Sequence, residues 1–272
     1  MEWGTFSKVL GELKLYGGEV NTVVLYHGGE PLLNPDLDEM INRIKQTEVG
    51  KVKIVTNGKI LEEAWSIRLI DSGLDEIEIS MDSTSIAGSN LVRRRSNSSQ
   101  TIQNIKLLEN LSRERDSDLR VSISTTQFVD EYDIDTIDML TKARTPIWLQ
   151  EIFPHMQIKS TWAVQWPGGF PLESKVAFMA RVEQLPTTCS LLEETITVRS
   201  NGDVVVCCYD LIGLSNLGNV HSLTLSNIWN SAQYANFRYE FARKNYREPC
   251  SSCAVVTGSK YLKRSELLLI EG

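Results

Sequence analysis

Hydrophobic and polar positions in the first 153 residues follow two periods in turn. A period of 3.6 residues predicts five helices, and a period of two with β-branched residues predicts five strands between them. The predicted strands are 22–26, 51–55, 76–80, 120–124 and 147–149. The predicted helices begin at about residues 6, 34, 61, 102 and 134. Short apolar strands separated by helices are typical of a parallel sheet with right-handed crossovers.

This half of the chain therefore predicts an α/β fold. Five strands are too few for a closed eight-fold barrel, so a partial (β/α) barrel fits better. The sequence begins with a helix, and the strand that would precede it in such a barrel is missing. In the second helix, Asn34 can act as the cap and Pro35 fits the first turn. Its expected buried stripe is Leu37, Met40, Ile41 and Ile44.

The pattern changes at about residue 154. Prolines, glycines and tryptophans mark 154–188 as a loop-rich linker, and the residues from 189 to 272 read as a small α+β domain. Two β-branched runs, 195–198 and 203–206, flank Asn201-Gly202, which is a strong signal for a hairpin. A helix is expected over 225–241.

Composition excludes several classes of protein. Of 272 residues, 28 are basic and 35 acidic, and the net charge of −7 disfavours binding to nucleic acid or to an anionic membrane. The chain has no apolar run near the roughly 20 residues of a membrane span, and its first residues do not read as a signal peptide. Five cysteines are too few for a disulfide-rich secreted fold. We expect a soluble, cytoplasmic protein with neither nucleic acid nor membrane as a partner.

Small and polar residues follow four consecutive predicted strands. Parallel α/β sheets bind ligands at this edge, and two glycines let a ligand approach the backbone closely. Such an edge could hold a polar ligand by hydrogen bonds, although each segment alone also fits ordinary turn chemistry. The four segments are Gly28-Gly29-Glu30-Pro31, Thr56-Asn57-Gly58, Ser80-Met81-Asp82-Ser83 and Ser124-Thr125-Thr126.

Four of the five cysteines form two spaced pairs. Cys189 is followed after 12 residues by Gly202 and after four more by Cys207, while Cys250 and Cys253 lie in one short loop. Four thiolates suit a [4Fe–4S] cluster or Zn²⁺, and the two pairs favour a metal site over scattered buried cysteines. In a regular strand Cys208 would point away from Cys207, so we do not count it as a ligand.

With these motifs the chain resembles the radical S-adenosylmethionine (SAM) enzymes that carry a C-terminal SPASM or twitch auxiliary iron–sulfur domain. The Gly-Gly-Glu-Pro segment is similar to the family motif that binds the amino group of the methionyl moiety. The first cysteine pair fits the family pattern Cys-x(9–15)-Gly-x4-Cys, and the second pair fits its other half. The further cysteines of a full SPASM domain are absent, which favours the twitch form with one auxiliary cluster.

The resemblance implies a division into three parts and two sets of site residues. Residues 1–153 would form a radical-SAM-like partial (β/α)6 barrel, 154–188 a linker, and 189–272 a SPASM/twitch-like domain. The expected SAM-binding residues are Gly28, Gly29, Glu30, Pro31, Thr56, Asn57, Ser80, Asp82, Arg93 and Ser124. The expected ligands of an auxiliary [4Fe–4S] cluster are Cys189, Cys207, Cys250 and Cys253.

One departure concerns the family's Cys-x3-Cys-x2-Cys triad, which binds the cluster that cleaves SAM. No cysteine precedes Cys189 in this sequence. In the family the triad lies between the first strand and the first helix, so the missing strand and the missing triad are one gap. We expect an upstream segment encoding that strand and three cysteines, and whether this chain is itself an enzyme stays open.

Three functions remain as alternatives. The first is a radical SAM enzyme that modifies a peptide, a sugar or an aminoglycoside-like molecule, with a reductant protein as a partner. The second is a non-catalytic iron–sulfur or SAM-binding protein. The third is a protein in which the C-terminal cysteines hold a structural Zn²⁺.

Overall fold

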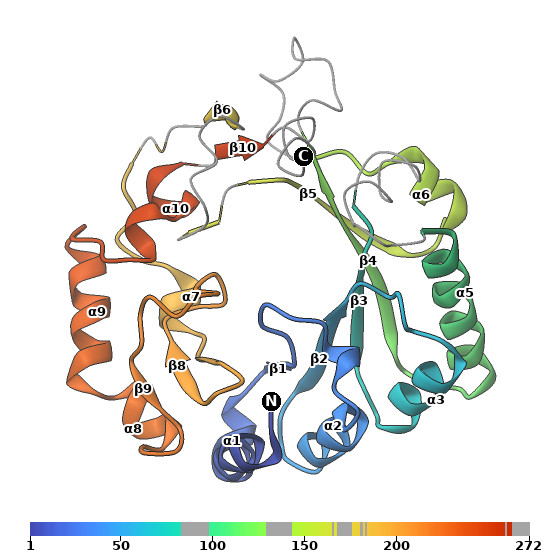
Figure 1. Ribbon diagram of the computed structural model, residues 1–272, viewed down its shortest axis with the longest axis horizontal. Helices are drawn as coiled ribbons and strands as arrows, with labels where there is room; N and C mark the ends of the chain where they lie inside the picture. Colours follow the sequence, from blue (N-terminus) through green and yellow to red (C-terminus); the bar gives the residue numbers. More distant parts are fainter. Residues whose placement is uncertain are drawn as a thin grey trace, which may run out of the picture. The chain divides into compact units, whose positions relative to one another are not determined.

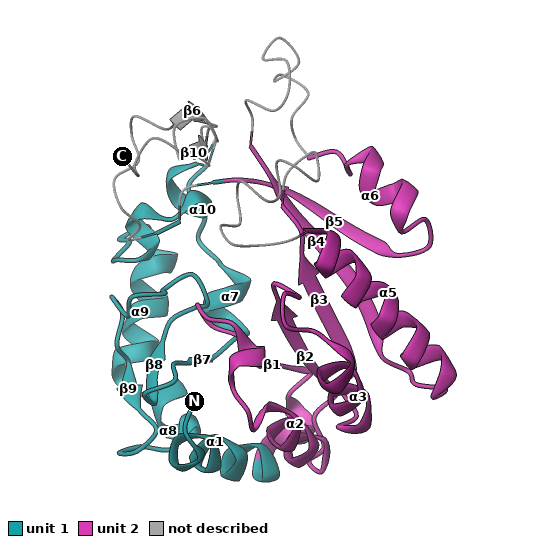
Figure 2. Cartoon of the chain, turned by 45° about the vertical axis from the view of Figure 1, so that its right-hand side comes forward, with its two compact units in different colours: residues 1–15, 164–262 teal, residues 16–163, 263–272 magenta. Residues whose placement is uncertain are grey.

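The structure is a computed structural model in which the chain forms two compact units (Figures 1 and 2). Unit 1 comprises residues 1–15 and 164–262, and unit 2 comprises 16–163 and 263–272. The structure describes residues 1–82, 98–128, 143–164, 166–167, 176–179, 182, 184–258 and 260–262.

Unit 2 is built on a five-stranded sheet in the order β1-β2-β3-β4-β5, in which all neighbouring strands are parallel. The strands are β1 (Thr22–Val24), β2 (Lys51–Thr56), β3 (Glu76–Ser80), β4 (Arg120–Gln127) and β5 (Gln157–Trp162). Strand order therefore follows chain order, as right-handed crossovers between neighbours require. In the described part of the chain the sheet is open, which confirms the predicted α/β fold.

The helices of unit 2 lie along one face of this sheet (Figure 1). They are α2 (Leu37–Lys45), α3 (Glu63–Asp71), α5 (Ser98–Glu114) and α6 (Ile147–Ile152), with 3-10 turns η1 (Gly17–Glu19) and η2 (Pro31–Leu33). Alternate strand residues such as Ile54, Ile77 and Ile123 are fully buried. The predicted stripe of α2 is also buried, and Gly73 ends the α3 segment with a positive φ of 77°.

The start of the second helix differs from the prediction. The helix expected from Asn34 begins at Leu37 instead, with Asp36 at its N-cap. Asn34 precedes a proline, which disfavours helical backbone, and its ψ is 112°. Its side chain instead accepts a hydrogen bond from the Asp36 amide at 3.2 Å.

The predicted last strand, 147–149, was wrong because it lies in helix α6. Only Leu149 is buried there and Ile147 is 72% exposed, and three apolar residues cannot distinguish a strand from a helical turn. The fifth strand is β5, which lies in the stretch read as a loop-rich linker. The helix predicted over 134–143 lies almost wholly outside the described residues, of which only 143 is described.

Unit 1 combines helices with two small antiparallel sheets, β7-β8-β9 and β6-β10. The hairpin expected around Asn201-Gly202 is confirmed as β7–β8, and Gly202 has a positive φ of 91°. The strands of unit 1 are β6 (Val176–Met179), β7 (Thr197–Val198), β8 (Asp203–Val205), β9 (Gly218–Asn219) and β10 (Lys260–Leu262). Its helices are α1 (Trp3–Tyr16), α7 (Ser190–Glu193), α8 (Leu225–Trp229), α9 (Ala232–Ala242), α10 (Ala254–Thr257) and the 3-10 turn η6 (Cys250–Ser252).

The single helix predicted over 225–241 is two helices. The first helix, α8, ends at Trp229 with Asn230 as its C-cap. Ser231 then caps α9, because its side chain accepts a hydrogen bond from the Tyr234 amide. Tyr234 and Phe237 of α9 then pack with Val204 of β8 in the core of unit 1.

Burial on one face of the sheet predicts which side chains stabilise the core of unit 2. Replacing fully buried Ile54 by Ala should lower the free energy of unfolding by about 2–5 kcal/mol, because a cavity forms between sheet and helices. Leu33→Ala, at a side chain that is 73% exposed, is the matched control and should change it by no more than about 0.5 kcal/mol. Urea unfolding of both variants measures the difference, and equal losses would contradict the assigned core.

Candidate functional site

Glu30 ties the loop after β1 to the end of β2. One carboxylate oxygen accepts hydrogen bonds from the Leu32 amide at 3.1 Å and the Thr56 hydroxyl at 2.6 Å. The other oxygen accepts one from the Asn57 amide at 2.8 Å. The Glu30 side chain is therefore fixed by both segments that it joins, rather than free in a turn.

The loop before Glu30 leaves room for a ligand. Gly28 has a φ of 67°, a conformation that favours glycine. A Cβ atom added at Gly29 would meet no heavy atom within 4 Å. Pro31 begins the 3-10 turn η2, whose N-cap is Glu30.

The turn after β2 is held from a distant helix. The side-chain amide of Asn104, which is buried in α5, donates to the carbonyl of Gly58 at 3.0 Å. Gly58 has a φ of 67°, and an added Cβ would lie 2.9 Å from the Ile79 side chain. The sequence analysis missed Asn104, which only the three-dimensional contact identifies.

A second group of predicted residues joins the ends of β3 and β4. Ser80 and Ser124 are paired in the sheet register, and their hydroxyl oxygens lie 3.4 Å apart. Asp82 accepts a hydrogen bond from the Thr126 amide at 2.9 Å. The strand ends of unit 2 thus carry two hydrogen-bonded groups, one around Glu30 and one around Ser124. Arg93 lies outside the described residues, as do Ser83, Arg94 and Arg95.

The four predicted cysteine ligands line one cavity in unit 1. Each lies at the edge of an element: Cys189 is the N-cap of α7, Cys207 follows β8, Cys250 begins η6, and Cys253 is the N-cap of α10. The rest of the lining is mainly apolar and includes Leu192, Val206, Phe241 and Val256. Cys208 is exposed and does not line this cavity.

The surroundings of these thiols fit a cationic metal centre. Burial raises the pKa of Cys207 and of Cys250 to about 12, and it also raises the pKa of Cys253. A bound metal supplies the positive charge that stabilises deprotonated thiols in apolar surroundings. Among the described residues, no three His, Cys, Asp or Glu side chains lie as a ready metal-binding group. Binding would therefore require the four thiols to turn toward a common centre.

Two further residues, which the sequence analysis did not count among the site residues, hold the cysteine segments in place. Asp210, fully buried, accepts hydrogen bonds from the amides of Gly213, Leu214 and Ser215, and so fixes the loop after Cys207. Arg238 of α9 stacks on the rings of Trp229 and Tyr234 at 3.8 and 3.9 Å. A buried carboxylate in a turn-rich segment is a weak sequence signal, and the Arg238 contacts are not visible in sequence spacing.

The family model described as "Radical SAM superfamily" matches residues 2–141, and the model "SPASM: Iron-sulfur cluster-binding domain" matches residues 189–254. A probable GTP 3',8-cyclase from Methanococcus maripaludis strain C5 is 44% identical over 55 residues. That segment spans 20% of this chain and only 18% of the relative.

Solved structures show the same fold at low identity. The structure of "anSMEcpe with bound AdoMet" has a TM-score of 0.61 at 12% identity, and covers 95% of this chain and 76% of that one. The structure of BtrN in complex with AdoMet and 2-DOIA has a TM-score of 0.53 at 14% identity, covering 96% and 84%. SuiB of Streptococcus suis, bound to S-adenosylmethionine, has a TM-score of 0.54 at 13% identity, covering 93% and 63%.

None of the helices within the described ranges is both long and apolar enough to cross a membrane.

The three hydrogen bonds that Glu30 accepts predict that removing its charge destabilises the protein. Glu30→Gln should lower the free energy of unfolding by about 1–3 kcal/mol, because an amide cannot accept all three hydrogen bonds. Glu39→Gln, in an exposed ion pair with Arg43, is the control and should cost about 0.5 kcal/mol or less. Chemical unfolding followed by circular dichroism gives both values, and a Glu30 variant as stable as its control would contradict the tie between β1 and β2.

Proposed function

The chain belongs to the radical SAM superfamily, and from this we propose that it serves radical modification of a peptide, a sugar or an aminoglycoside-like molecule. SAM would bind at the strand ends of unit 2, and an auxiliary [4Fe–4S] cluster would bind in the four-cysteine cavity of unit 1. The observation that carries the proposal is that four cysteines from separate segments line a single apolar cavity.

The match to an iron–sulfur cluster-binding domain supports the proposed cluster, because it spans all four cysteines. A structural zinc site would use the same thiolates, so the proposal commits to iron on the family match. The solved structures similar in fold include BtrN with 2-DOIA and SuiB with a precursor peptide. These named molecules support a small-molecule or peptide substrate. A reductant protein would be the electron source.

The strand ends supply binding and positioning for SAM. SAM bound there would supply radical chemistry for hydrogen-atom abstraction, and this would need an electron from a cluster for which the given sequence, with no cysteine before Cys189, offers no ligands. Gly29 leaves space beside the backbone, and Glu30 acts as a positioning residue that holds this loop on β2. The hydroxyls of Ser80 and Ser124 offer donors and acceptors at the neighbouring strand ends.

The four thiols would hold the auxiliary cluster, which supplies one-electron redox chemistry. Asp210 and Arg238 act on that site as positioning residues. Asp210 fixes the loop that follows Cys207. Arg238 is held in place by the hydrogen bonds that it donates to the carbonyls of Leu192 and Trp229.

Metal analysis tests the cavity directly. Protein purified without oxygen should contain about four irons and four sulfides per chain. Cys207→Ser and Cys250→Ser should each lose most of this iron, because each removes a lining thiol. Cys208→Ser is the matched control next in sequence and should retain it. About one zinc per chain without sulfide would overturn the cluster and leave a structural metal site.

Product analysis tests whether the 272-residue chain cleaves SAM by itself. The 272-residue chain reconstituted with iron, sulfide, SAM and a reductant should form no 5′-deoxyadenosine above a no-protein control, because no cysteine precedes Cys189 to hold a SAM-cleaving cluster. Chromatography of the quenched mixture measures this product. Its formation in excess of the control would show that this chain makes the radical by itself.

A further inference from the structure

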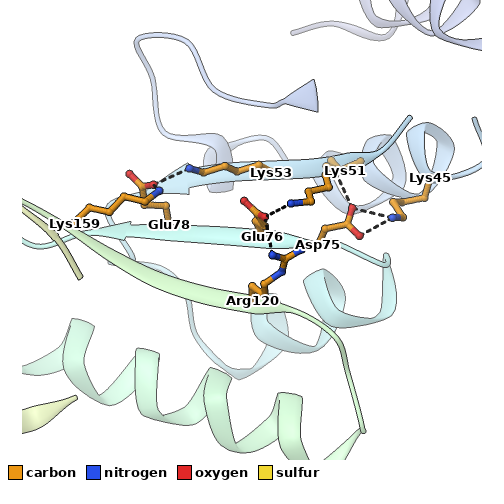
Figure 3. Close-up of polar contacts among 9 residues, drawn as sticks. Lys45, Lys51, Lys53, Asp75, Glu76, Glu78, Arg120 and Lys159 are labelled. Carbon is orange, nitrogen blue, oxygen red and sulfur yellow. Dashed lines mark hydrogen bonds and ion pairs between the residues drawn. The ribbon is translucent and has the colours of Figure 1, made fainter. Parts of the chain in front are cut away.

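The face of the unit 2 sheet opposite the buried isoleucines carries two rows of charged side chains (Figure 3). In the first row, Glu76 of β3 pairs with Lys51 of β2 at 3.1 Å and with Arg120 of β4 at 3.6 Å. In the second row, one oxygen of Glu78 pairs with Lys53 at 2.7 Å and with Lys159 of β5 at 2.8 Å.

The two-residue period of the strands places these side chains on one face. Lys51 and Lys53 alternate with the buried Val52 and Ile54, as Glu76 and Glu78 alternate with Ile77 and Ile79. The second row reaches the candidate SAM site, because Lys159 is in register with Ser124, which in turn pairs with Ser80.

Each row holds two cations and one carboxylate, so each carries a surplus positive charge. Burial raises the pKa of Glu78, but hydrogen bonds from Lys159 and Lys53 outweigh it and hold that pKa below the ordinary glutamate value. The Glu78 carboxylate is therefore ionised, and its single negative charge is shared between the two ammonium groups of Lys53 and Lys159. Asp75, the residue before Glu76 in the chain, is itself paired with Lys45 at 2.8 Å.

The three side chains of the second row differ in exposure. Glu78 is 14% exposed and Lys53 is 18% exposed, whereas Lys159 is 45% exposed. The carboxylate is therefore largely covered, and the row presents its positive charge to solvent mainly through Lys159. One cation is enough to neutralise Glu78, so the second ammonium group of the row adds a positive charge that no carboxylate of the row balances.

We propose that the row of Lys53, Glu78 and Lys159 binds an oxyanion, a phosphate or carboxylate group of the substrate. The two ammonium groups would donate charge-assisted hydrogen bonds, and Glu78 would hold them side by side. The first row adds to the positive potential on the same face. The inference rests on the proposed function only where it assigns the anion to a substrate.

Anion binding to the purified chain tests the row without any radical chemistry. Calorimetric titration uses inorganic pyrophosphate as the phosphate probe, malonate as the carboxylate probe and SAM as the cofactor. We expect pyrophosphate or malonate to bind, and the one that binds identifies the chemical class. Lys53→Gln and Lys159→Gln should each weaken that binding about tenfold, since each removes one charged donor. Arg115→Gln, in an exposed pair with Asp71 on another part of unit 2, is the control and should leave it unchanged.

The Glu78→Gln variant tests whether the row of Lys53, Glu78 and Lys159 binds an anion or only stabilises the sheet. The substitution keeps the shape and frees both ammonium groups, so the affinity for the probe should be maintained or increased. Loss of binding in Glu78→Gln with unchanged binding in Lys159→Gln would overturn the proposal, as would binding of SAM alone or of neither probe. Thermal unfolding confirms that each variant is folded, and the iron and sulfide content, measured separately, decides the proposed function whatever the titrations give.

Discussion

The two-residue alternation of the parallel strands is the constraint on which unit 2 depends. A parallel sheet covered by helices on one face must bury every second side chain there, and β2 and β3 do this with Val52, Ile54, Ile77 and Ile79. The intervening positions then have to lie on the other face. This chain fills them with lysine and glutamate, which no buried core accepts without a partner. Packing on one face and charge pairing on the other are therefore two results of one register.

The same register brings the segments of the candidate SAM site together. Parallel strands end at one edge, so loops far apart in sequence become neighbours there. Glu30 turns that nearness into a fixed geometry, since one carboxylate serves donors from its own loop and from the end of β2. Asn104 does the same for the Gly58 turn from a helix 46 residues away. A site held in this way is formed before a ligand arrives, which reduces the ordering that binding requires.

Sequence patterns predicted those parts of the fold in which local signals and tertiary packing agree. The strand 76–80 alternates strictly and was predicted with its observed ends. The hairpin at Asn201-Gly202 was also predicted, although its strands are shorter than the predicted runs 195–198 and 203–206. Strand β5 was not predicted, because Gln157–Trp162 is mostly polar and adopts its extended conformation through pairing with β4. The segment 147–149 misled because its apolar residues also fit one helical turn. The lysines and glutamates of the charged rows are visible in the sequence, but their pairing depends on the strand register and on β5.

The cysteine cavity shows why a site can be predicted from spacing while its supports cannot. Motif spacing identifies four thiols in two pairs, and in the structure the segments on either side of the β7–β8 hairpin and the loop at 250–253 bring them to one cavity. It says nothing of the medium, which here is apolar and raises the pKa of Cys207 and Cys250 to about 12. Four thiolates in such a cavity would repel one another and lack solvation, so the charged form needs a cation among them. The buried Asp210 network and the stacked Arg238 then gain a physical role, since they hold segments whose thiols have no reason to converge until that cation binds.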